Sequence, residues 1–179
     1  MINGCGYGTQ LLLAVEMSGA VIRDLWPADE LAAERLLDAE LGGRHQARLG
    51  EMNDVLALPG LGGWENDRLI GLATYALGGN RAELTALAVI RARRRRGIGG
   101  HLVEAAASLA AGAGADELWL VTNNDNLDAL RLHQRHGSHL TELHAGAVDR
   151  ARELKPTIPL LGQHGIPLRD VLILTRPMA

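Results

Sequence analysis

The sequence predicts one α/β domain with a mixed, mostly antiparallel sheet that contains one parallel pair of strands. The chain has 179 residues, of which 47% are hydrophobic, and this is enough for one core without metals or disulfides. Before residue 80, short apolar runs are separated by turn residues, which is typical of antiparallel strands. After residue 80, a strand, a long helix and a second strand follow one another, which is typical of two parallel strands joined by a crossover helix.

The composition narrows the location and the partners. The formal net charge is −3, so overall charge favours neither nucleic acid nor a membrane surface, and no segment is long enough to span a bilayer. The single cysteine, Cys5, excludes an intramolecular disulfide framework. No Lys or Arg precedes Arg23, which argues against a signal peptide. We expect a cytoplasmic protein whose one domain spans residues 1–179, with residues 1–18 as a loosely ordered leader.

The first half of the chain predicts strands around one helix. Residues 20–25 alternate as in a strand, and residues 31–41 carry apolar side chains at helical spacing until Gly42 and Gly43 stop the helix. Residues 44–53 are polar and predict a short helix or loop. The next elements expected are a short strand over 54–58, a glycine-rich turn over 59–63, a strand over 68–77 and a hairpin turn over 78–80.

The second half begins with the predicted parallel pair. Residues 83–89 and 117–121 are compact apolar strands, and the helix between them runs over about 98–111. The elements expected after this pair are a helix over 126–136, a strand over 138–144, a helix over 147–154, a Pro/Gly-rich loop over 155–168 and a final strand over 170–175.

A glycine-rich turn joins the first strand of this pair to its helix. Residues 94–99 follow the spacing R-x-x-G-x-G, and Gly100 adds a further glycine. The first turn of a helix has backbone N–H groups without intrahelical partners, and Gly97 and Gly99 let a ligand come close to them. The turn lacks the Gly-Lys-Ser/Thr of a P-loop and the G-x-G-x-x-G of a dinucleotide fold. It predicts either an anion site or a solvated charged loop with a glycine helix start.

A second motif lies about one strand later, in residues 122–137, T-N-N-D-N-L-D-A-L-R-L-H-Q-R-H-G. Together the two motifs resemble the GNAT superfamily of acetyl-CoA-dependent N-acyltransferases, where an N-x-x-A-x-x-x-Y-x-x-x-G-F-like motif follows such a turn. Asn126, Ala129 and Gly137 match that motif. The resemblance covers residues 69–143, and no general family motif can be placed after Gly146.

The resemblance implies a GNAT-like sheet with a splayed parallel strand pair and helices on both faces. It implies acetyl-CoA as the acyl donor, with the pantetheine arm beside the first strand of the pair, the pyrophosphate on amides of the turn, and Asn126 facing the cofactor. The implied cofactor-binding residues are Leu87, Ala88, Val89, Arg94, Arg95, Arg96, Gly97, Ile98, Gly99, Gly100 and Asn126.

The chain departs from the family at two positions of this motif. His133 stands where the family has a Tyr that protonates the leaving thiolate, and Ser138 stands where it has a Phe. An imidazole N–H can protonate a thiolate, because their ordinary pKa values lie within roughly two units. The alternative is that His133 only replaces the Tyr in packing and that water supplies the proton.

Direct attack by an amine needs the neutral amine, so a carboxylate acting through water would help. Glu83 is the first candidate for this general base and Glu117 the second, although either could be an exposed strand-end carboxylate. The histidines around His133 lie on different faces and have no acidic or Cys ligand to complete a metal site. Residues 123–125 predict a turn that caps the following helix.

Three functions from different classes fit the sequence. The preferred one is an N-acetyltransferase in which a primary amine attacks acetyl-CoA directly in a ternary complex. The second is a non-catalytic acyl-CoA-binding module of the same fold. The third treats Arg91 and residues 93–96 as a nucleic-acid patch, which the net acidic chain and the lack of interleaved aromatic residues disfavour. The acceptor, a small molecule or a peptide, stays open, and a homodimer is possible because dimers are common in the family.

Overall fold

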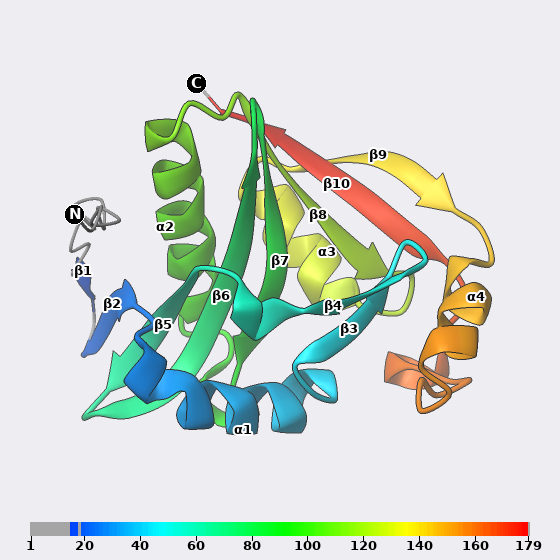
Figure 1. Ribbon diagram of the computed structural model, residues 1–179, viewed down its shortest axis with the longest axis horizontal. Helices are drawn as coiled ribbons and strands as arrows, with labels where there is room; N and C mark the ends of the chain where they lie inside the picture. Colours follow the sequence, from blue (N-terminus) through cyan, green and yellow to red (C-terminus); the bar gives the residue numbers. More distant parts are fainter. Residues whose placement is uncertain (1–14, 18, 179) are drawn as a thin grey trace, which may run out of the picture.

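The computed structural model describes residues 15–17 and 19–178 and contains one large sheet with helices on both faces (Figure 1). The helices are α1 (Glu30–Leu41), α2 (Ile98–Gly112), α3 (Leu127–Arg135) and α4 (Ala147–Leu154). The strands are β1 (Val15–Met17), β2 (Ala20–Asp24), β3 (His45–Arg48), β4 (Glu51–Asp54), β5 (Gly60–Glu65), β6 (Arg68–Gly78), β7 (Arg81–Val89), β8 (Glu117–Asn123), β9 (His139–His144) and β10 (Val171–Pro177).

The strand order in the large sheet is β1-β2-β5-β6-β7-β8-β10-β9, and β3 and β4 form a separate hairpin. Every neighbouring pair is antiparallel except β7 and β8, which run parallel. Helix α2 makes the crossover between these two strands. The predicted mixed sheet with one parallel pair is therefore confirmed.

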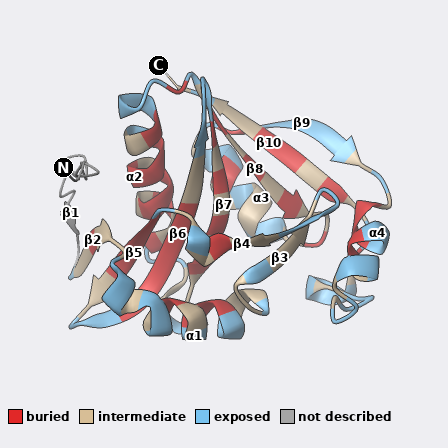
Figure 2. Cartoon of the chain, in the orientation of Figure 1, coloured by how far each residue is buried: buried red, intermediate tan, exposed pale blue. Residues whose placement is uncertain are grey.

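The core has two main parts, one on each face of the sheet. One part packs α2 and α3 against the sheet, and its most buried members include Leu102 and Leu118. The other packs α1 on the opposite face, around Leu37 and Leu72. Strands β6 and β7 contain many buried residues (Figure 2), and each strand contributes to both parts of the core. The small side chains of α2, such as Ala106, let this helix lie close to the sheet.

Helix ends follow the sequence signals. Gly42, which ends α1, has a φ of 71°, and Gly97, which precedes α2, has a φ of 86°. Both values lie in the left-handed region that glycine adopts without strain. Asn126 caps α3, because its side-chain oxygen accepts a hydrogen bond from the Ala129 N–H at 3.1 Å.

Three predictions in the first half of the chain were wrong. Residues 44–53 contain the β3–β4 hairpin rather than a helix or loop. The strand expected over 54–58 is a 3₁₀ turn, in which the Asp54 carboxylate accepts from the Leu56 N–H at 3.0 Å. The glycine-rich turn expected over 59–63 lies almost entirely in β5, a strand at the centre of the antiparallel part of the sheet.

Most of the leader expected over residues 1–18 lies outside the described residues. Its described part, Val15–Met17, forms β1, which pairs with β2. No described helix is both long and apolar enough to cross a membrane.

Candidate functional site

The site lies where the parallel strands separate. Pairing between β7 and β8 ends at Leu84 and Leu120, while β6 continues along β7 and β10 continues along β8. A β-bulge at Thr85 marks this point, since the register with β6 passes from Leu84 to Ala86 and leaves Thr85 without an opposite residue. The bulge also reverses the faces of β7: Leu84 packs on the α2 side and Ala86 on the α1 side.

Two connected hollows occupy this opening. An outer groove of about 560 Å³ runs between β7, the start of α2 and one side of α3. An inner pocket of about 190 Å³ lies between the separated strands under the β3–β4 hairpin. They share Leu41, Leu87, Asn126 and Ala129, so a ligand in the groove can reach the inner pocket. A long donor and a small acceptor could meet at this junction.

The start of α2 forms the polar end of the groove. The first backbone bond of this helix runs from the His101 N–H to Gly97 O at 3.0 Å, so the N–H groups of Ile98, Gly99 and Gly100 have no acceptor within the helix. Gly99 and Gly97 line the groove. A Cβ at Gly100 would come within 2.6 Å of His136 Nε2, so a side chain there would displace the imidazole. These free N–H groups and the helix dipole suit a phosphate.

The arginines of this turn divide into two groups. Arg94 donates to Glu40 Oε2 at 2.6 Å and to Val89 O at 3.1 Å, and Arg93 binds Glu65. Arg95 and Arg96 are exposed, and Arg95 lines the groove with a φ of 62°. Arg94 therefore fastens the turn to α1, whereas Arg95 is available to a phosphate. Two of the five arginines in the suggested nucleic-acid patch are held in ion pairs.

Fewer backbone groups of β7 are free to bind a ligand than the sequence indicates. Val89 O is occupied by Arg94, and Thr85 O accepts from Arg48 Nη1 at 2.8 Å. Carbonyl directions alternate along a strand, so the Leu87 backbone faces the same side as that of Val89. Among the three residues predicted to pair with a pantetheine arm, Leu87 is the one whose carbonyl oxygen is left open toward the gap, while Val89 keeps its N–H on that side. The backbone of Ala88, which is one residue further along, faces β6.

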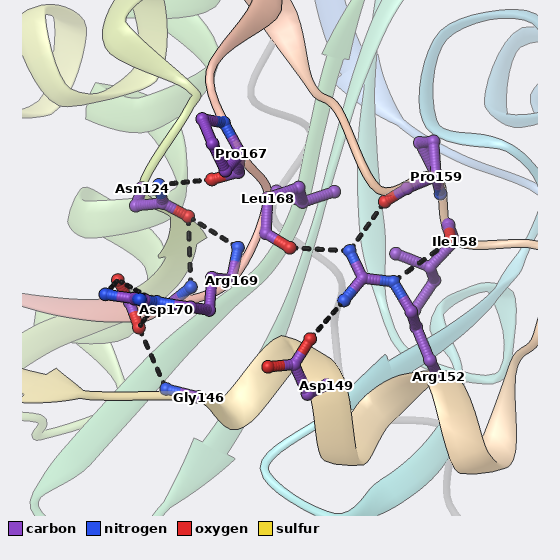
Figure 3. A network of polar contacts seen from close by, with 10 residues as sticks. All are labelled: Asn124, Gly146, Asp149, Arg152, Ile158, Pro159, Pro167, Leu168, Arg169 and Asp170. Carbon is purple, nitrogen blue, oxygen red and sulfur yellow. Dashed lines mark hydrogen bonds and ion pairs between the residues drawn. The ribbon is translucent and has the colours of Figure 1, made fainter.

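Residues 124 and 125 form the expected turn, whereas Asn123 ends β8 and the cap of α3 is Asn126 rather than one of the predicted residues. The turn also fixes a distant loop. The Asn124 side chain accepts from the backbone N–H groups of Arg169 and Asp170 and donates to Pro167 O (Figure 3). Buried Asp125 accepts from the Gln163 N–H at 2.8 Å. The turn that begins α3 thus anchors the loop over 155–170 beside the groove.

Arg152 anchors the same loop from α4. Its guanidinium donates to the backbone carbonyls of Ile158, Pro159 and Leu168, and it binds Asp149 in the preceding turn (Figure 3). The sequence predicts a Pro/Gly-rich loop here, and these contacts hold that loop at both ends. Through this anchoring, Gln163 becomes part of the groove wall.

His133 is buried in the inner pocket. It is 3% exposed, and its Nδ1 has no hydrogen-bond partner among the described residues. Burial, helped by the neighbouring His136 ring, lowers the pKa of His133 from 6.5 to about 4. The ring is therefore neutral near pH 7. A neutral imidazole is a weak proton donor, so the lowered pKa of His133 favours the alternative in which water protonates a leaving thiolate.

The two candidate bases lie in different places. Glu83 is next to the opening, but its carboxylate contacts the Arg48 guanidinium and is not part of the lining of either hollow. Glu117 pairs with Arg81 at the far, closed end of β7 and β8. Glu117 is thus a strand-end carboxylate away from the site. The Glu83 carboxylate is separated from the inner pocket by the Arg48 guanidinium, which it binds.

Two sets of side chains were not found from the sequence, one in the lining of the inner pocket and one outside the lining of either hollow. One is Arg48 with Gln46 on the hairpin, which lines the inner pocket. The other is Glu104, which binds His136 at 2.8 Å and Arg176 at 2.8 and 2.9 Å. Arg176 lowers the pKa of Glu104, with a smaller contribution from His136. The described residues contain no group of three or more His, Cys, Asp or Glu placed to hold a metal ion.

Comparison with known proteins identifies the family. The acetyltransferase (GNAT) family model matches residues 19–138. The uncharacterized protein YxbD of Bacillus subtilis is 37% identical over 115 residues, which cover 64% of this chain and 70% of YxbD, and YdhI of the same organism is 31% identical over 112 residues.

Solved structures agree with this result at the level of the fold. The crystal structure of a Bacillus subtilis acetyltransferase in complex with CoA superposes with a TM-score of 0.70 at 20% identity, over 88% of this chain and 98% of that one. A GNAT family acetyltransferase from Elizabethkingia anophelis with acetyl-CoA bound gives 0.63 at 20% identity, over 90% of this chain and 100% of that one. The chain belongs to the acetyltransferase (GNAT) family.

Proposed function

We propose that the protein is an N-acetyltransferase that moves an acetyl group from acetyl-CoA to a primary amine by direct attack in a ternary complex. The observation that carries this proposal is the continuous path from the open amides at the start of α2, along β7, to the inner pocket. The family match and the CoA and acetyl-CoA complexes of relatives with this fold support it. We expect the reaction to occur in the cytoplasm.

The groove fits the donor in both shape and chemistry. Its volume of about 560 Å³ is typical of a site for a large ligand, and its glycine-lined end offers N–H groups to a pyrophosphate. The Leu87 backbone would pair with the pantetheine arm, Arg95 and Arg96 would add positive charge, and Asn126 would face the arm from the cap of α3. The donor supplies a thioester, whose acetyl carbon is open to attack by a neutral amine. The protein's part is to bind and orient the two substrates.

His133 is proposed to act as a neutral hydrogen-bonding group in the inner pocket. A buried polar atom without a partner costs about 1–3 kcal/mol, and a bound substrate or water on Nδ1 would recover part of this. The thiolate would then take its proton from water. Glu83, as a general base, would have to act through water, because its carboxylate contacts Arg48.

A non-catalytic acyl-CoA-binding module is the second candidate. The replacement of the family Tyr by a neutral His133 favours it, since a module without catalysis has no need of a general acid. Both candidates predict acetyl-CoA binding, and they differ in product formation.

The test is incubation of the protein with acetyl-CoA and a panel of primary amines, with detection of N-acetylated products by mass spectrometry and of free CoA thiol. Acetylation of at least one amine above the rate without enzyme supports the transferase. Binding of acetyl-CoA without any product across amines, amino acids and peptides supports the module, and absence of acetyl-CoA binding contradicts both.

A further inference from the structure

The charge in the lining of the inner pocket belongs to one side chain, which is paired with Glu83 just outside the lining. Among the lining residues that the structure describes, Arg48 is the one charged side chain, and the other polar ones, such as Gln46, Thr122 and Asn123, are neutral. No carboxylate among the described residues lines this pocket, since the Glu83 carboxylate contacts the Arg48 guanidinium outside the lining. A polyamine or a polycationic antibiotic would therefore enter a pocket that offers it a cation and no anion.

Arg48 is held in the lining of this pocket by fixed partners. It ends β3 just before a two-residue turn, Leu49 and Gly50, whose φ angles are both positive, as in a tight hairpin. Its side chain is only 11% exposed. Nη1 donates to Thr85 O at 2.8 Å and Nη2 binds Glu83, so two of its five N–H groups are accounted for.

This arrangement suits recognition of a carboxylate. A carboxylate and a carbonyl oxygen fix the orientation of this guanidinium. Its remaining N–H groups lie in one plane, and this geometry matches the two oxygens of a carboxylate ligand. Burial lowers the pKa of Arg48 to about 10, so the group stays positive at neutral pH. Desolvation also strengthens any ion pair that forms inside the pocket.

The size of the pocket limits the acceptor. Its volume of about 190 Å³ is below the roughly 300–1,000 Å³ of pockets for drug-sized ligands. A single arginine also matches a monoanion better than a dianionic phosphate. These observations point to an acceptor of about the size of an amino acid.

We propose that Arg48, positioned by Glu83 and Thr85 O, binds the carboxylate of a small amine acceptor, and that the acceptor is an amino acid or a compound of that class. This inference rests on the proposed acetyl transfer and names the class of acceptor for the same site.

The experiment compares matched acceptors in which only the carboxylate differs. Proteinogenic L-amino acids are assayed beside their α-carboxamides, ω-amino acids beside the corresponding alkylamines, and putrescine and spermidine serve as polycations. We expect a carboxylate-bearing acceptor with a KM about tenfold or more below that of its neutral partner, the range of one charge-assisted contact. The same ligands are titrated onto the CoA-saturated protein, with melting temperature as the readout, so the test does not depend on turnover.

Variants of the ion pair separate binding from proton transfer. Arg48→Gln should remove the carboxylate preference while acetyl-CoA still raises the melting temperature to about the wild-type extent. Arg48→Lys should retain part of it, because it keeps the charge but not the planar fork. Glu83→Gln should raise KM for carboxylate acceptors at nearly constant kcat if Glu83 positions Arg48, and should lower kcat for every acceptor if it is the base.

The outcomes distinguish the two proposals. A protein that binds acetyl-CoA and shows no carboxylate preference, in transfer or in binding to the CoA complex, overturns the role of Arg48 and leaves the acetyltransferase intact. A preference that survives Arg48→Gln overturns it as well. A protein that fails to bind acetyl-CoA contradicts the proposed function itself.

Discussion

His133 makes the pH dependence of stability testable at a single residue. Its pKa is about 4 in the folded protein and near 6.5 in an unfolded chain, so the unfolded state takes up the proton first as the pH falls. The difference between the two pKa values therefore costs no stability above pH 6.5 and progressively more between pH 6.5 and 4, up to about 3 kcal/mol. His133→Phe keeps about the same side-chain volume but cannot take up a proton. Between pH 7 and 4, the free energy of unfolding measured by urea titration should therefore fall by about 3 kcal/mol less in this variant than in the wild type. Equal losses in both proteins would contradict the burial of a neutral ring.

The same substitution tests the chemistry at neutral pH. If His133 only packs and hydrogen-bonds, His133→Phe should lower kcat by less than about tenfold. A general acid would be worth about 10²–10⁴. His133→Tyr restores the family residue and serves as the comparison. A loss of 10² or more in the Phe variant, recovered by Tyr, would show that the side chain delivers a proton.

Gly99 and Gly112 form a matched pair in helix α2. A Cβ at Gly99 would make ordinary contacts with Leu132 and Val89, and one at Gly112 would meet nothing within 4 Å. Each Gly→Ala change should raise the free energy of unfolding by less than the roughly 0.5–1 kcal/mol of a helix interior, because both residues lie at the ends of α2. Gly99 lines the groove, so Gly99→Ala should also weaken acetyl-CoA binding about tenfold, whereas Gly112→Ala should leave it unchanged. Equal affinities in calorimetric titration would remove Gly99 from the cofactor site.

Residues whose role depends on the backbone conformation of their own segment can be found from the sequence. The open amides near Gly99 and the cap at Asn126 follow from the spacing of glycines and short polar residues, and the structure has both features. Arg48 could not be found in this way. Its partner Glu83 lies 35 positions away, and only the folded hairpin brings the two together.

At the scale of elements, Glu40 joins the end of α1 to the turn before α2. It is 12% exposed, binds Arg94 at 2.6 Å and accepts from the Arg91 N–H at 3.0 Å. Glu40→Gln keeps the shape and removes the charge. We expect a loss of about 1 kcal/mol or less, because Arg94 is partly exposed, and a several-fold higher KM for acetyl-CoA as the turn loosens.

The control for this change is Glu34→Gln, on the same helix. Glu34 is more exposed and lies 3.8 Å from Arg44, in a weaker ion pair away from the groove. Urea denaturation midpoints and acetyl-CoA KM should be close to wild type for this variant. Equal effects of the two substitutions would mean that Glu40 has no special link to the cofactor turn.

Strand β5 and the β3–β4 hairpin were wrongly predicted because contacts with the rest of the fold determine their structure. Gly60, Gly62 and Gly63 read as a turn, but their missing side chains make room for Leu25, Trp64 and Ile98 against β5. The β3–β4 hairpin turns at Leu49 and Gly50, and leucine at positive φ is not a usual turn signal. Tertiary contacts override local propensity in both cases.

At the scale of the whole molecule, the strand–helix–strand unit and its parallel pairing are predictable from periodicity and the right-handed crossover rule. The position of β10 between β8 and β9 is not, because the last strand enters the sheet beside a strand distant in sequence. Strand β10 pairs with β8 along the edge that faces away from β7. The opening between β7 and β8 is therefore a property of the complete sheet.

The most direct test of the central claim, that this opening binds acetyl-CoA, is the melting temperature of the protein with and without it. At about 100 times Kd, mass action should add about 2.7 kcal/mol, which is roughly 5–10 °C for a chain of this size. We expect the melting temperature to rise with acetyl-CoA concentration until it saturates, and Gly99→Ala to reduce this rise. No rise at millimolar acetyl-CoA would contradict it.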